Sequence, residues 1–226
     1  MIKLEKTDIY GWESAIRGMR NPMNSWAKSD SVDCQDDCAF CEYSGNCPNF
    51  TNGNFFIGKN DHDLMMRLAK GGSTHAKYRR MIVVYVDITA PLYWWKEFDT
   101  YKVGTVANSC STMHKIHAKE FTIDDFSFEH IHSSNLLWAI PAELNKWRTL
   151  YLETNDKYYW WQMIQLLPTS YNQKRTVMLN YEVLCAMYND RRNHKLDEWH
   201  TFCDWIRELP YSEIIIGESS NECESN

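Results

Sequence analysis

No apolar run in the sequence approaches the roughly 20 residues that a helix needs to cross a bilayer. The opening residues, MIKLEKTDIYGW, lack the long apolar core of a secretion signal. Positive charge is not in excess, because 24 Lys and Arg stand against 30 Asp and Glu, for a formal net charge of −6. These absences predict a soluble, cytoplasmic protein without membrane association. They also disfavour broad nucleic-acid binding, since a net-negative surface repels phosphate backbones.

Internal repeats and low-complexity tracts are also absent. What the chain has in quantity is aromatic residues, with 10 Trp, 13 Tyr and 9 Phe making up 14% of it. Large flat side chains in this number indicate a heavily packed core or a sizeable subunit interface, with a base-stacking surface as the alternative. For the adjacent Trp94 and Trp95, a place in the core or in an interface is favoured over stacking on a base.

Four of the eight cysteines are crowded into one segment. Residues 33–50 read DCQDDCAFCEYSGNCPNF, and the four cysteines are Cys34, Cys38, Cys41 and Cys47. Cytosolic cysteines are thiols or metal ligands rather than disulfides, so four thiolates here could hold a structural zinc ion. An iron–sulfur cluster and a polar loop with incidental thiols are the alternatives, because only Cys38 and Cys41 have the Cys-x-x-Cys spacing.

Local patterns predict an α+β protein with a strand-bearing first half and a helical second half. The first half is expected to start with a helix at 12–20 and an inserted Cys-rich loop at 21–60. A second helix follows, which Asn60 or Asp61 caps and which Gly71 and Gly72 end. After it we expect a strand at 81–88 that is apolar on both faces, and a helix that begins at Pro91. The second half is expected to contain helices at 141–153, 155–167, 174–190 and 196–208. One domain over residues 1–215 and an acidic flexible tail at 216–226 complete the prediction.

Three stretches, in order, resemble the flavin-dependent thymidylate synthases. LMMRLAKGGSTHAKYRRMIVVYVDITAPLYWWKEF (64–98) has the family's helix, His-bearing turn, strand ending in Ala-Pro and aromatic-rich helix. DTYKVGTVANSCST (99–112) lies where the family carries its Arg-His-Arg-x-x-Ser signature. LLPTSYNQKRTVMLNYEVLCAMYNDRRNHKLDEW (166–199) follows the family's Leu-Pro and a helix bearing an Asn and an Asn-x-Arg. The resemblance implies the family's α+β fold and its homotetramer, with active sites between subunits.

The family's signature falls on residues 100–105, which read TYKVGT. Only Lys102 keeps a positive charge there, and Thr105 keeps a hydroxyl. An arginine fork binds phosphate in a bidentate manner, which Lys does only as a point charge. The resemblance implies that Tyr101, Lys102 and Thr105 face a nucleotide pocket, and capping and packing at a helix end is their alternative role.

The Ser-Gly-Arg that the family offers to the nucleotide phosphate falls on Cys110, Ser111 and Thr112, so a second arginine is lost. A third falls near Ile164. Cys110 aligns with the family's active-site serine, which makes it a candidate nucleophile, with an inert buried thiol as the alternative. The remaining cations that could partly compensate are Lys102, Lys174, Arg175, Arg191 and Arg192.

Arg191 keeps the arginine of the Asn-x-Arg pattern, with Asn189 before it and Asn180 earlier in the same stretch. In the family this arginine lies by the pyrimidine and polarises it, so Arg191 is the expected catalytic residue. A solvated cation at a helix C-terminus is its alternative role. His75 lies on the turn where the family touches its flavin, or it is an ordinary turn histidine.

Each lost charged phosphate contact removes on the order of 1.5–3 kcal/mol of binding free energy. We therefore expect a thymidylate synthase-like nucleotide-binding protein with a remodelled pocket, a small nucleotide as its ligand, and a homo-oligomeric, tetrameric assembly. FAD and zinc are the candidate cofactors. The functions left open are a divergent flavin-dependent enzyme of the dUMP-methylating type, a non-catalytic protein of phage or mobile-element origin that sequesters a nucleotide, and a zinc-stapled protein-interaction module.

Overall fold

The computed structural model of the chain describes residues 2–33 and 55–217. Four strands form an antiparallel sheet in the order β1-β4-β6-β5. Their bounds are β1 Lys3–Tyr10, β4 Val83–Pro91, β5 Val106–Ser109 and β6 Asn172–Asn180. The pairing of β4 with β6 covers all nine residues of each strand, from Val83 opposite Asn180 to Pro91 opposite Asn172.

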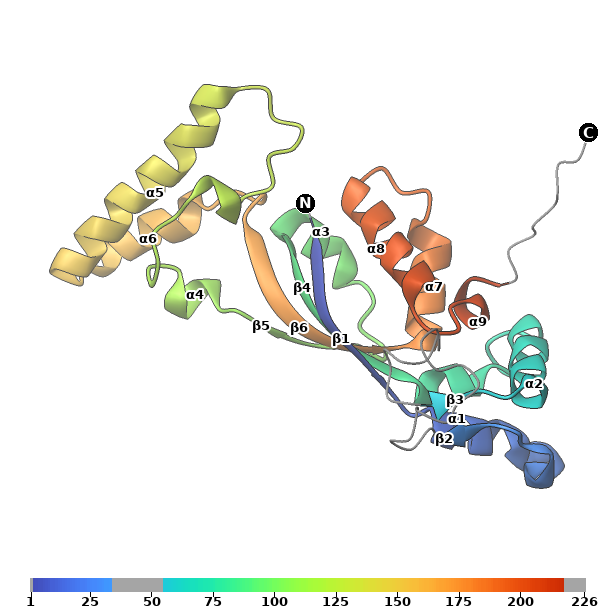
Figure 1. Ribbon diagram of the computed structural model, residues 1–226. Coiled ribbons are helices and arrows are strands. Elements are labelled where there is room, and N and C mark those ends of the chain that lie inside the picture. The colour runs from blue at the N-terminus through green and yellow to red at the C-terminus, as the bar shows by residue number, and fades with distance from the viewer. Residues whose placement is uncertain (1, 34–54, 218–226) are drawn as a thin grey trace, which may run out of the picture.

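Helices cover one face of this sheet. The helices are α1 Trp12–Arg20, α2 Lys59–Lys70, α3 Leu92–Phe98, α4 Thr112–Lys115, α5 Ser134–Thr154, α6 Lys157–Leu166, α7 Tyr181–Arg191, α8 Asp197–Glu208 and α9 Glu213–Ile216. Figure 1 shows α3, α7 and α8 over the sheet, the α5–α6 hairpin projecting at one end, and α1 and α2 near the other. None of the helices in the described ranges combines the length and apolar character that spanning a membrane requires.

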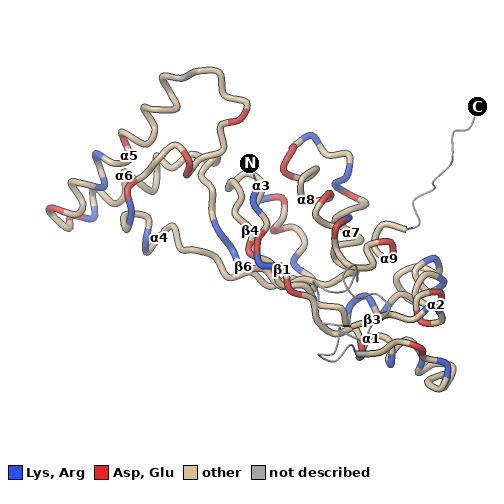
Figure 2. Tube along the Cα trace, viewed as in Figure 1, with Lys and Arg blue, Asp and Glu red and all other residues tan. Residues whose placement is uncertain are grey.

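The strand predicted at 81–88 is present as β4, but the expectation of two apolar faces is wrong. Val84, Val86 and Ile88 are buried, whereas Tyr85 is exposed. On that outer face Asp87 accepts a hydrogen bond from Thr176 (2.6 Å) and pairs with Lys174 at 3.1 Å. The basic stretch of β6 is visible there in Figure 2. An antiparallel sheet packed on one side alternates in this way, with polar side chains on the solvated face.

The main core joins α3 to α8 through aromatic rings. Trp94 and Trp95 are 0% and 1% exposed, which places both in the core as expected. The Trp94 ring lies 4.8 Å from that of Trp199 and 5.7 Å from that of Phe202, between ring centroids. The Trp95 indole donates to the Gln173 carbonyl at 2.9 Å and so ties α3 to β6. This packing fixes the position of α3 on the sheet.

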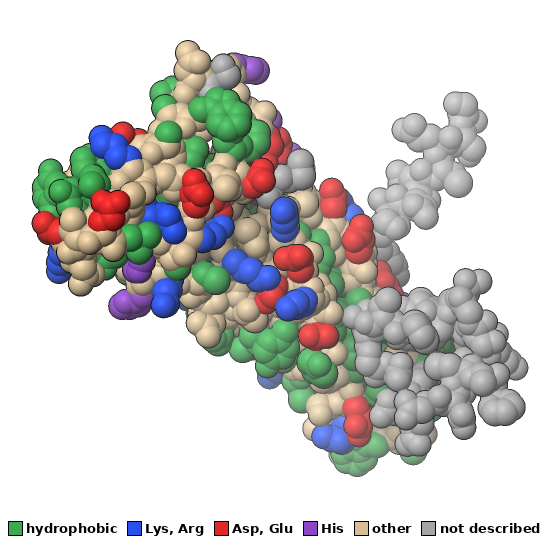
Figure 3. Space-filling view, turned by 60° about the vertical axis from the view of Figure 1, so that its left-hand side comes forward, with side chains coloured by type: hydrophobic (Ala, Val, Ile, Leu, Met, Phe, Trp, Pro, Cys, Tyr) green, Lys and Arg blue, Asp and Glu red, His purple; other side chains and the backbone are tan. Residues whose placement is uncertain are grey.

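A smaller hydrophobic cluster lies under the α5–α6 hairpin. Its buried members are Ile116, Phe121, Phe126, Leu144 and Met163, and Ile164 packs against it. The outer sides of the two helices carry large apolar side chains in the open, which Figure 3 shows as hydrophobic surface at this end of the molecule. The most exposed of these are Leu136, Trp138, Leu152, Tyr158 and Leu166. This hairpin therefore buries only part of its apolar surface within one chain.

The helix predicted at 174–190 is wrong, because residues 172–180 form β6 and the helix starts at Tyr181. Within β6, Gln173, Val177 and Leu179 alternate inward, and pairing on both sides overrides the helical pattern. The Asn180 side chain then accepts from the Val183 amide at 3.0 Å and caps α7. Strands thus come from both halves of the chain, and the division into a strand-bearing and a helical half is wrong.

Other boundaries also differ from the predictions. The helix expected at 141–153 starts seven residues earlier as α5 and contains Pro141. The helices expected at 155–167 and 196–208 match α6 and α8 closely. The polar strands β1 and β5 were not predicted. At the C-terminus, Ile215 is buried, and Ile216, which was expected in the tail, packs against the core in α9. Residues 218–226 lie outside the described part.

The region predicted as a loop at 21–60 is ordered where it is described. It contains short 3-10 turns at Asn21–Met23 and Trp26–Lys28, and β2 (Val32–Asp33) pairs with β3 (Phe55–Phe56). Helix α2 begins at Lys59, with neither Asn60 nor Asp61 as its cap. Instead the Asp30 carboxylate accepts from the Asn60 and Asp61 amides at 2.9 and 3.1 Å. A residue distant in sequence therefore replaces the local cap, whereas Gly71 ends the helix as predicted.

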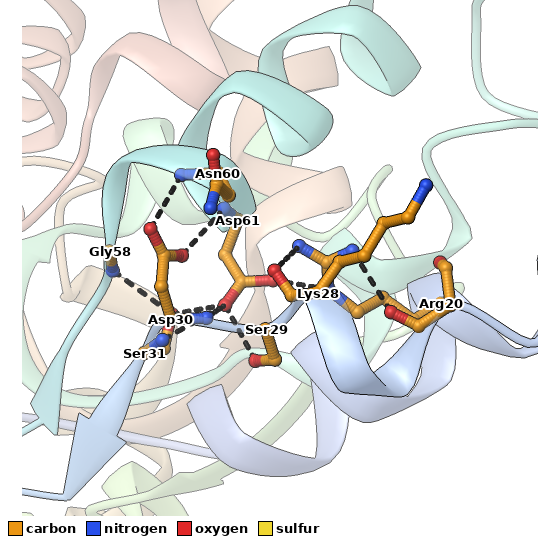
Figure 4. A network of polar contacts seen from close by, with 9 residues as sticks. Arg20, Lys28, Ser29, Asp30, Ser31, Gly58, Asn60 and Asp61 are labelled. Carbon is orange, nitrogen blue, oxygen red and sulfur yellow. Dashed lines mark hydrogen bonds and ion pairs between the residues drawn. The ribbon is translucent and has the colours of Figure 1, made fainter.

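A buried ion pair fastens this region to α2. The Asp61 carboxylate is 0% exposed and accepts from Arg20 Nε at 2.5 Å, from the Ser29 and Ser31 hydroxyls at 2.7 Å each, and from two backbone amides (Figure 4). Burial raises the pKa of Asp61, but the hydrogen bonds from Ser31, Ser29 and Arg20 outweigh it and lower the pKa below its ordinary value. Asp61 therefore remains ionised opposite Arg20.

Asp61→Asn should lower the free energy of unfolding by about 3–5 kcal/mol at neutral pH, because it leaves the buried Arg20 without its counter-charge. The pKa of Asp61 is lowered in the folded state, so its contribution is full above the ordinary carboxyl pKa and is lost as the pH falls through the folded value. The difference between wild type and variant should accordingly shrink below about pH 4. Urea unfolding across pH measures both effects. Asp63→Asn, an exposed carboxylate on the same helix, is the control, and equal losses in the two variants would contradict the prediction.

Candidate functional site

Arg191, the last residue of α7, lies against the segment that follows α3. Its Nη1 pairs with Glu97 Oε2 at 2.6 Å, and its Nε donates to the Tyr101 hydroxyl at 2.9 Å. Its guanidinium carbon lies 4.9 Å from the ring centroid of Trp199 and 5.5 Å from that of Tyr101. Contacts of this kind hold a guanidinium in one orientation. Arg191 is therefore a fixed, partly buried cation rather than a solvated one.

One oxygen of Glu97 collects donors from three side chains. Besides Arg191, the indole N–H of Trp199 donates to Glu97 Oε2 at 3.2 Å, and His194 Nε2 lies 3.1 Å from the same atom. We call these residues, together with Tyr101, the Glu97 cluster. The cluster joins α3, the loop after it, the end of α7 and the start of α8. The carboxylate neutralises Arg191 from within the chain.

The hydroxyl of Tyr101 connects Arg191 of this cluster to Asp190. Burial raises the pKa of Tyr101, and a hydrogen bond to Asp190 adds to the rise while Arg191 opposes it. The phenol therefore stays neutral, donating to Asp190 Oδ2 at 3.1 Å while it accepts from Arg191. A neutral hydroxyl held this way can position a ligand but does not act as a strong base at neutral pH.

The neighbouring predicted residues have structural roles within the chain. The Thr105 hydroxyl donates to the Tyr101 carbonyl, and Asn180 caps α7 as described above. Gly104 has a φ of +82°, and a Cβ there would lie 3.0 Å from Asn180 Nδ2. Glycine is thus required where the loop crosses the start of α7. The structure thus brings Tyr101, Thr105, Asn180 and Arg191 into one area, and Lys102 is exposed on the same loop.

Cys110 and Ser111 lie elsewhere, at the far end of β5. Ser109 pairs with Arg175, so this end of the sheet is five residues along β6 from Asn180, about 17 Å away. Cys110 is exposed, which rules out the buried-thiol alternative, and its carbonyl accepts from Gln173 Nε2 at 2.8 Å. The Ser111 hydroxyl accepts from the His114 amide and caps α4. Within one chain, Cys110 and Ser111 therefore do not lie near Arg191.

Two of the other cations expected to compensate for lost arginines, Lys174 and Arg175, are engaged within the chain, whereas Arg192 is exposed. Lys174 lies 3.1 Å from Asp87 and 3.6 Å from Glu5 on the outer face of the sheet. Arg175 pairs with Asp99 at 2.7 Å and stacks 4.1 Å from the ring centroid of Trp95. Both are consumed by contacts within the chain. Neither side chain can bind a phosphate without losing its ion pair.

His75 and Asn189 lie near a pocket of about 430 Å³ between α2 and α7. Asn189 lines it, and the turn bearing His75 contributes Gly72 and Ser73, while His75 itself is exposed outside it. The rest of the wall is mainly apolar and comes from α2, α7 and α9, including Met66, Ala69, Ala186 and Ile215. We call this the α2–α7 pocket. It lies on the opposite end of the helical layer from Cys110.

A buried guanidinium borders this pocket. Arg79 is 7% exposed, and its Nη1 lies 3.4 Å from Cys185 Sγ and 3.6 Å from Glu182 Oε2. Its Nε is buried and has no hydrogen-bond partner within the described part of the chain. An unsatisfied buried donor costs about 1–3 kcal/mol, so an acceptor supplied by a ligand would be stabilised here. Burial raises the pKa of the Cys185 thiol, which keeps it protonated.

Metal ligation stays a prediction for the crowded cysteines. Cys34, Cys38, Cys41 and Cys47 lie outside the described residues. Within residues 2–33 and 55–217 no group of three or more His, Cys, Asp or Glu side chains is arranged to hold a metal ion.

Sequence reasoning missed Glu97, His194 and Arg79. Glu97 lies on the aromatic-rich helix α3. A carboxylate next to Phe98 was the only local feature that could have marked it as a site residue. His194 follows Arg191 by three residues, a spacing that indicates a shared location at a helix end. Arg79 is one of three cations at 77–80, shortly after His75. Its burial depends on α7 and could not be inferred locally.

Glu97→Gln should lower the free energy of unfolding by about 1–2 kcal/mol, because it weakens a charged hydrogen bond that solvent already screens in part. The fluorescence of Trp199, whose indole donates to Glu97, should shift in the folded state. Urea unfolding followed by fluorescence measures both. Glu120→Gln, an exposed carboxylate without an ion pair in the described part of the chain, is the control. Identical midpoints for the two variants would show that the cluster does not depend on this charge.

No protein-family model matches the sequence, and no curated protein matches it. Among solved structures, the chain is similar to flavin-dependent thymidylate synthase ThyX from Helicobacter pylori complexed with FAD and dUMP, with a TM-score of 0.64 and 14% identity over 94% of this chain and 95% of that one. A second structure of that enzyme, also with FAD and dUMP, gives 0.63 and 14% over 95% of each chain. At this identity the likeness shows the fold alone. Over nearly its whole length, the chain has the fold of the flavin-dependent thymidylate synthases.

Proposed function

We propose that the protein is a divergent relative of the flavin-dependent thymidylate synthases that binds a small nucleotide in a remodelled cleft. The observation that carries this is the meeting of Tyr101 and Arg191, 2.9 Å apart, although they are 90 residues apart in the chain. It occurs in a fold that this chain shares with two solved structures that hold FAD and dUMP. The loop after α3 and the end of α7 thus form one polar surface around a fixed guanidinium.

The Glu97 cluster suits a nucleobase better than a phosphate. Arg191 is already neutralised by Glu97, so a phosphate would have to compete with a carboxylate 2.6 Å away. Arg191 Nη2 and Glu97 Oε1 make no hydrogen bond within the described part of the chain, which leaves a donor beside an acceptor. The N–H and C=O edge of a pyrimidine presents the matching pattern. The exposed Lys102 is our candidate for the phosphate, as a point charge.

These contacts favour binding over the family's methylation chemistry. Three arginines of the family's pattern are replaced by uncharged residues and one by Lys102, and the arginine that is kept, Arg191, is held by Glu97. The role of Arg191 in catalysis therefore stays a proposal, in which it polarises the bound base. Nucleotide binding requires only the donor and acceptor pair described above. Binding is the function that we put forward.

A flavin is the second candidate ligand, because the α2–α7 pocket offers an unsatisfied buried donor at Arg79 Nε. Lys70, Arg79 and Asn189 would hold its polar groups, and a volume of about 430 Å³ lies within the usual range for a small-molecule site. The Glu182 carboxylate in the same wall opposes a diphosphate, so the fit is partial. When bound, a flavin supplies hydride-transfer chemistry.

We also propose that the protein is a homo-oligomer. The exposed apolar side chains of the α5–α6 hairpin include Trp138 at 68% and Tyr158 at 58% exposure. Apolar surface gathered on one projecting element marks an association site. A second copy of the chain is the partner we expect there.

Freshly purified protein should release a nucleotide on denaturation, detected by mass spectrometry, or should bind added dUMP in titration calorimetry. Arg191→Ala should weaken that binding at least tenfold, about the effect of one lost charged contact. Arg192→Ala, the exposed neighbouring cation, should stay within about twofold of wild type and serves as the charge-matched control.

Failure of the wild type to release any nucleotide and to bind dUMP at millimolar concentration would remove the proposal. A visible absorption spectrum tests the flavin separately. Bands of a bound flavin support it, and a colourless protein that still binds the nucleotide removes the flavin and leaves the binding function intact.

Trp138→Glu should reduce the assembly size measured by light scattering after size-exclusion chromatography, because it places a charge within the apolar interface. Met23→Glu, at a side chain 81% exposed on a different element, should leave the assembly unchanged. A wild-type mass equal to one chain at micromolar concentration would contradict the oligomer.

A further inference from the structure

A second cavity, of about 740 Å³, lies where α2 meets the end of α1. Four of its lining residues are cations, namely Arg20, Lys28, Arg67 and Lys70. We call it the basic pocket. It shares no residue with the Glu97 cluster, and with the α2–α7 pocket it shares only Met66 and Lys70. It is therefore a separate site, and what it binds is independent of the proposed nucleotide cleft.

The basic pocket concentrates positive charge in a chain whose net charge is −6. Among the lining residues that belong to the described part of the chain, Asp63 is the only carboxylate. The Lys28 ammonium has no ion-pair partner within the described part of the chain and points away from Asp61 (Figure 4). Arg67 contributes one hydrogen bond, from Nε to the Asp63 carbonyl at 3.3 Å. Like charges gathered around a concave surface repel each other, and an anion placed between them relieves that repulsion.

The pocket is built on a rigid base. Arg20 is 4% exposed, and besides Asp61 it donates to the carbonyls of Ser25 at 3.3 Å and Lys28 at 3.1 Å. These bonds fix the backbone from which the Lys28 side chain extends. From the other wall, Arg67 and Lys70 lie three residues apart and face the same side of α2. Figure 2 shows basic positions along this helix. Preorganised cations bind an anion with less loss of entropy than mobile ones do.

The N-terminal amides of α2 play no part in this pocket, because Asp30 already accepts from two of them. Recognition must come from side chains. His62 forms part of the wall and is held by Glu213, 2.7 Å from its Nε2. Ammonium and guanidinium groups on opposite walls can each take a different phosphate of one molecule. The volume is within the range of small-molecule sites and exceeds what one inorganic phosphate requires.

We propose that the basic pocket binds an oligophosphate, a small molecule with two or three linked phosphates. Lys28 contacts it from one wall, and Arg67 and Lys70 contact it from the other. The buried Arg20 contributes positive potential to the pocket while it stays hydrogen-bonded to Asp61. A concave site on a net-negative chain favours a small anion over the extended backbone of a nucleic acid.

Titration calorimetry with inorganic tripolyphosphate tests this on the full-length protein. The double variant Lys28→Ala/Arg67→Ala should weaken binding at least a hundredfold, whereas Lys115→Ala/Lys195→Ala should stay within about threefold. Both doubles remove two exposed cations, so they have the same net charge and differ only in location. Binding to the wild type should also weaken as salt is raised from 50 to 300 mM, because exposed charges are screened. Far-ultraviolet circular dichroism confirms that each variant is folded.

Two further titrants distinguish the possible sources of the phosphate. ATP binding that is lost in the first double and retained in the second supports a nucleoside oligophosphate, and binding of tripolyphosphate alone supports an inorganic one. Absence of tripolyphosphate binding to the wild type, or equal losses in the two doubles, overturns the proposal. Tighter binding of single-stranded DNA than of either small anion, lost in the first double only, would assign the pocket to nucleic acid and overturn it as well.

Discussion

The pairing of β4 with β6 is the constraint on which the rest of the structure depends. Its register, with Val83 opposite Asn180, makes the helices that follow these strands begin at opposite ends of the sheet. α3 and α7 then return over the same face, and the loop leaving α3 meets the last turn of α7. A slip of one residue would turn the buried side chains of β6 to solvent and shift the start of α7. The contact between Tyr101 and Arg191 therefore follows from strand pairing.

Within that arrangement, charge determines which ligands the Glu97 cluster can attract. A guanidinium on a helix end is a general anion receptor until a carboxylate occupies it. Glu97 does so at 2.6 Å, and Trp199 and Tyr101 hold the pair in place. The desolvation cost of the partly buried cation is offset inside the chain. Because the pair is already neutral, the ligand that we propose for it is one that offers both a donor and an acceptor rather than a bare anion.

The sequence predicted those elements whose periodicity is local. β4, α3 and α8 were predicted from local signals. Pro91 marks the boundary between β4 and α3, and regular apolar spacing indicates α8. β6 was missed because its polar residues and the helix after it merge into one helical pattern, and only pairing with two neighbours makes it a strand. The order of three motifs predicted that Tyr101 and Arg191 share a site, and the two side chains are in contact. Glu97 was not predicted, because its ion pair joins residues 94 apart and no local pattern encodes such a contact.

The chain uses buried or half-buried carboxylates in two different ways. Asp61 neutralises Arg20 inside the protein. The positive charges of Lys28 and Arg67, which line the cavity, are therefore not neutralised by Asp61. Glu97 neutralises Arg191 at the surface itself, so the positive potential there is cancelled where a ligand would arrive. The position of the carboxylate relative to the cation therefore determines whether a site favours an anion. The phosphate affinity that we propose for this molecule is accordingly on α2, away from the Glu97 cluster.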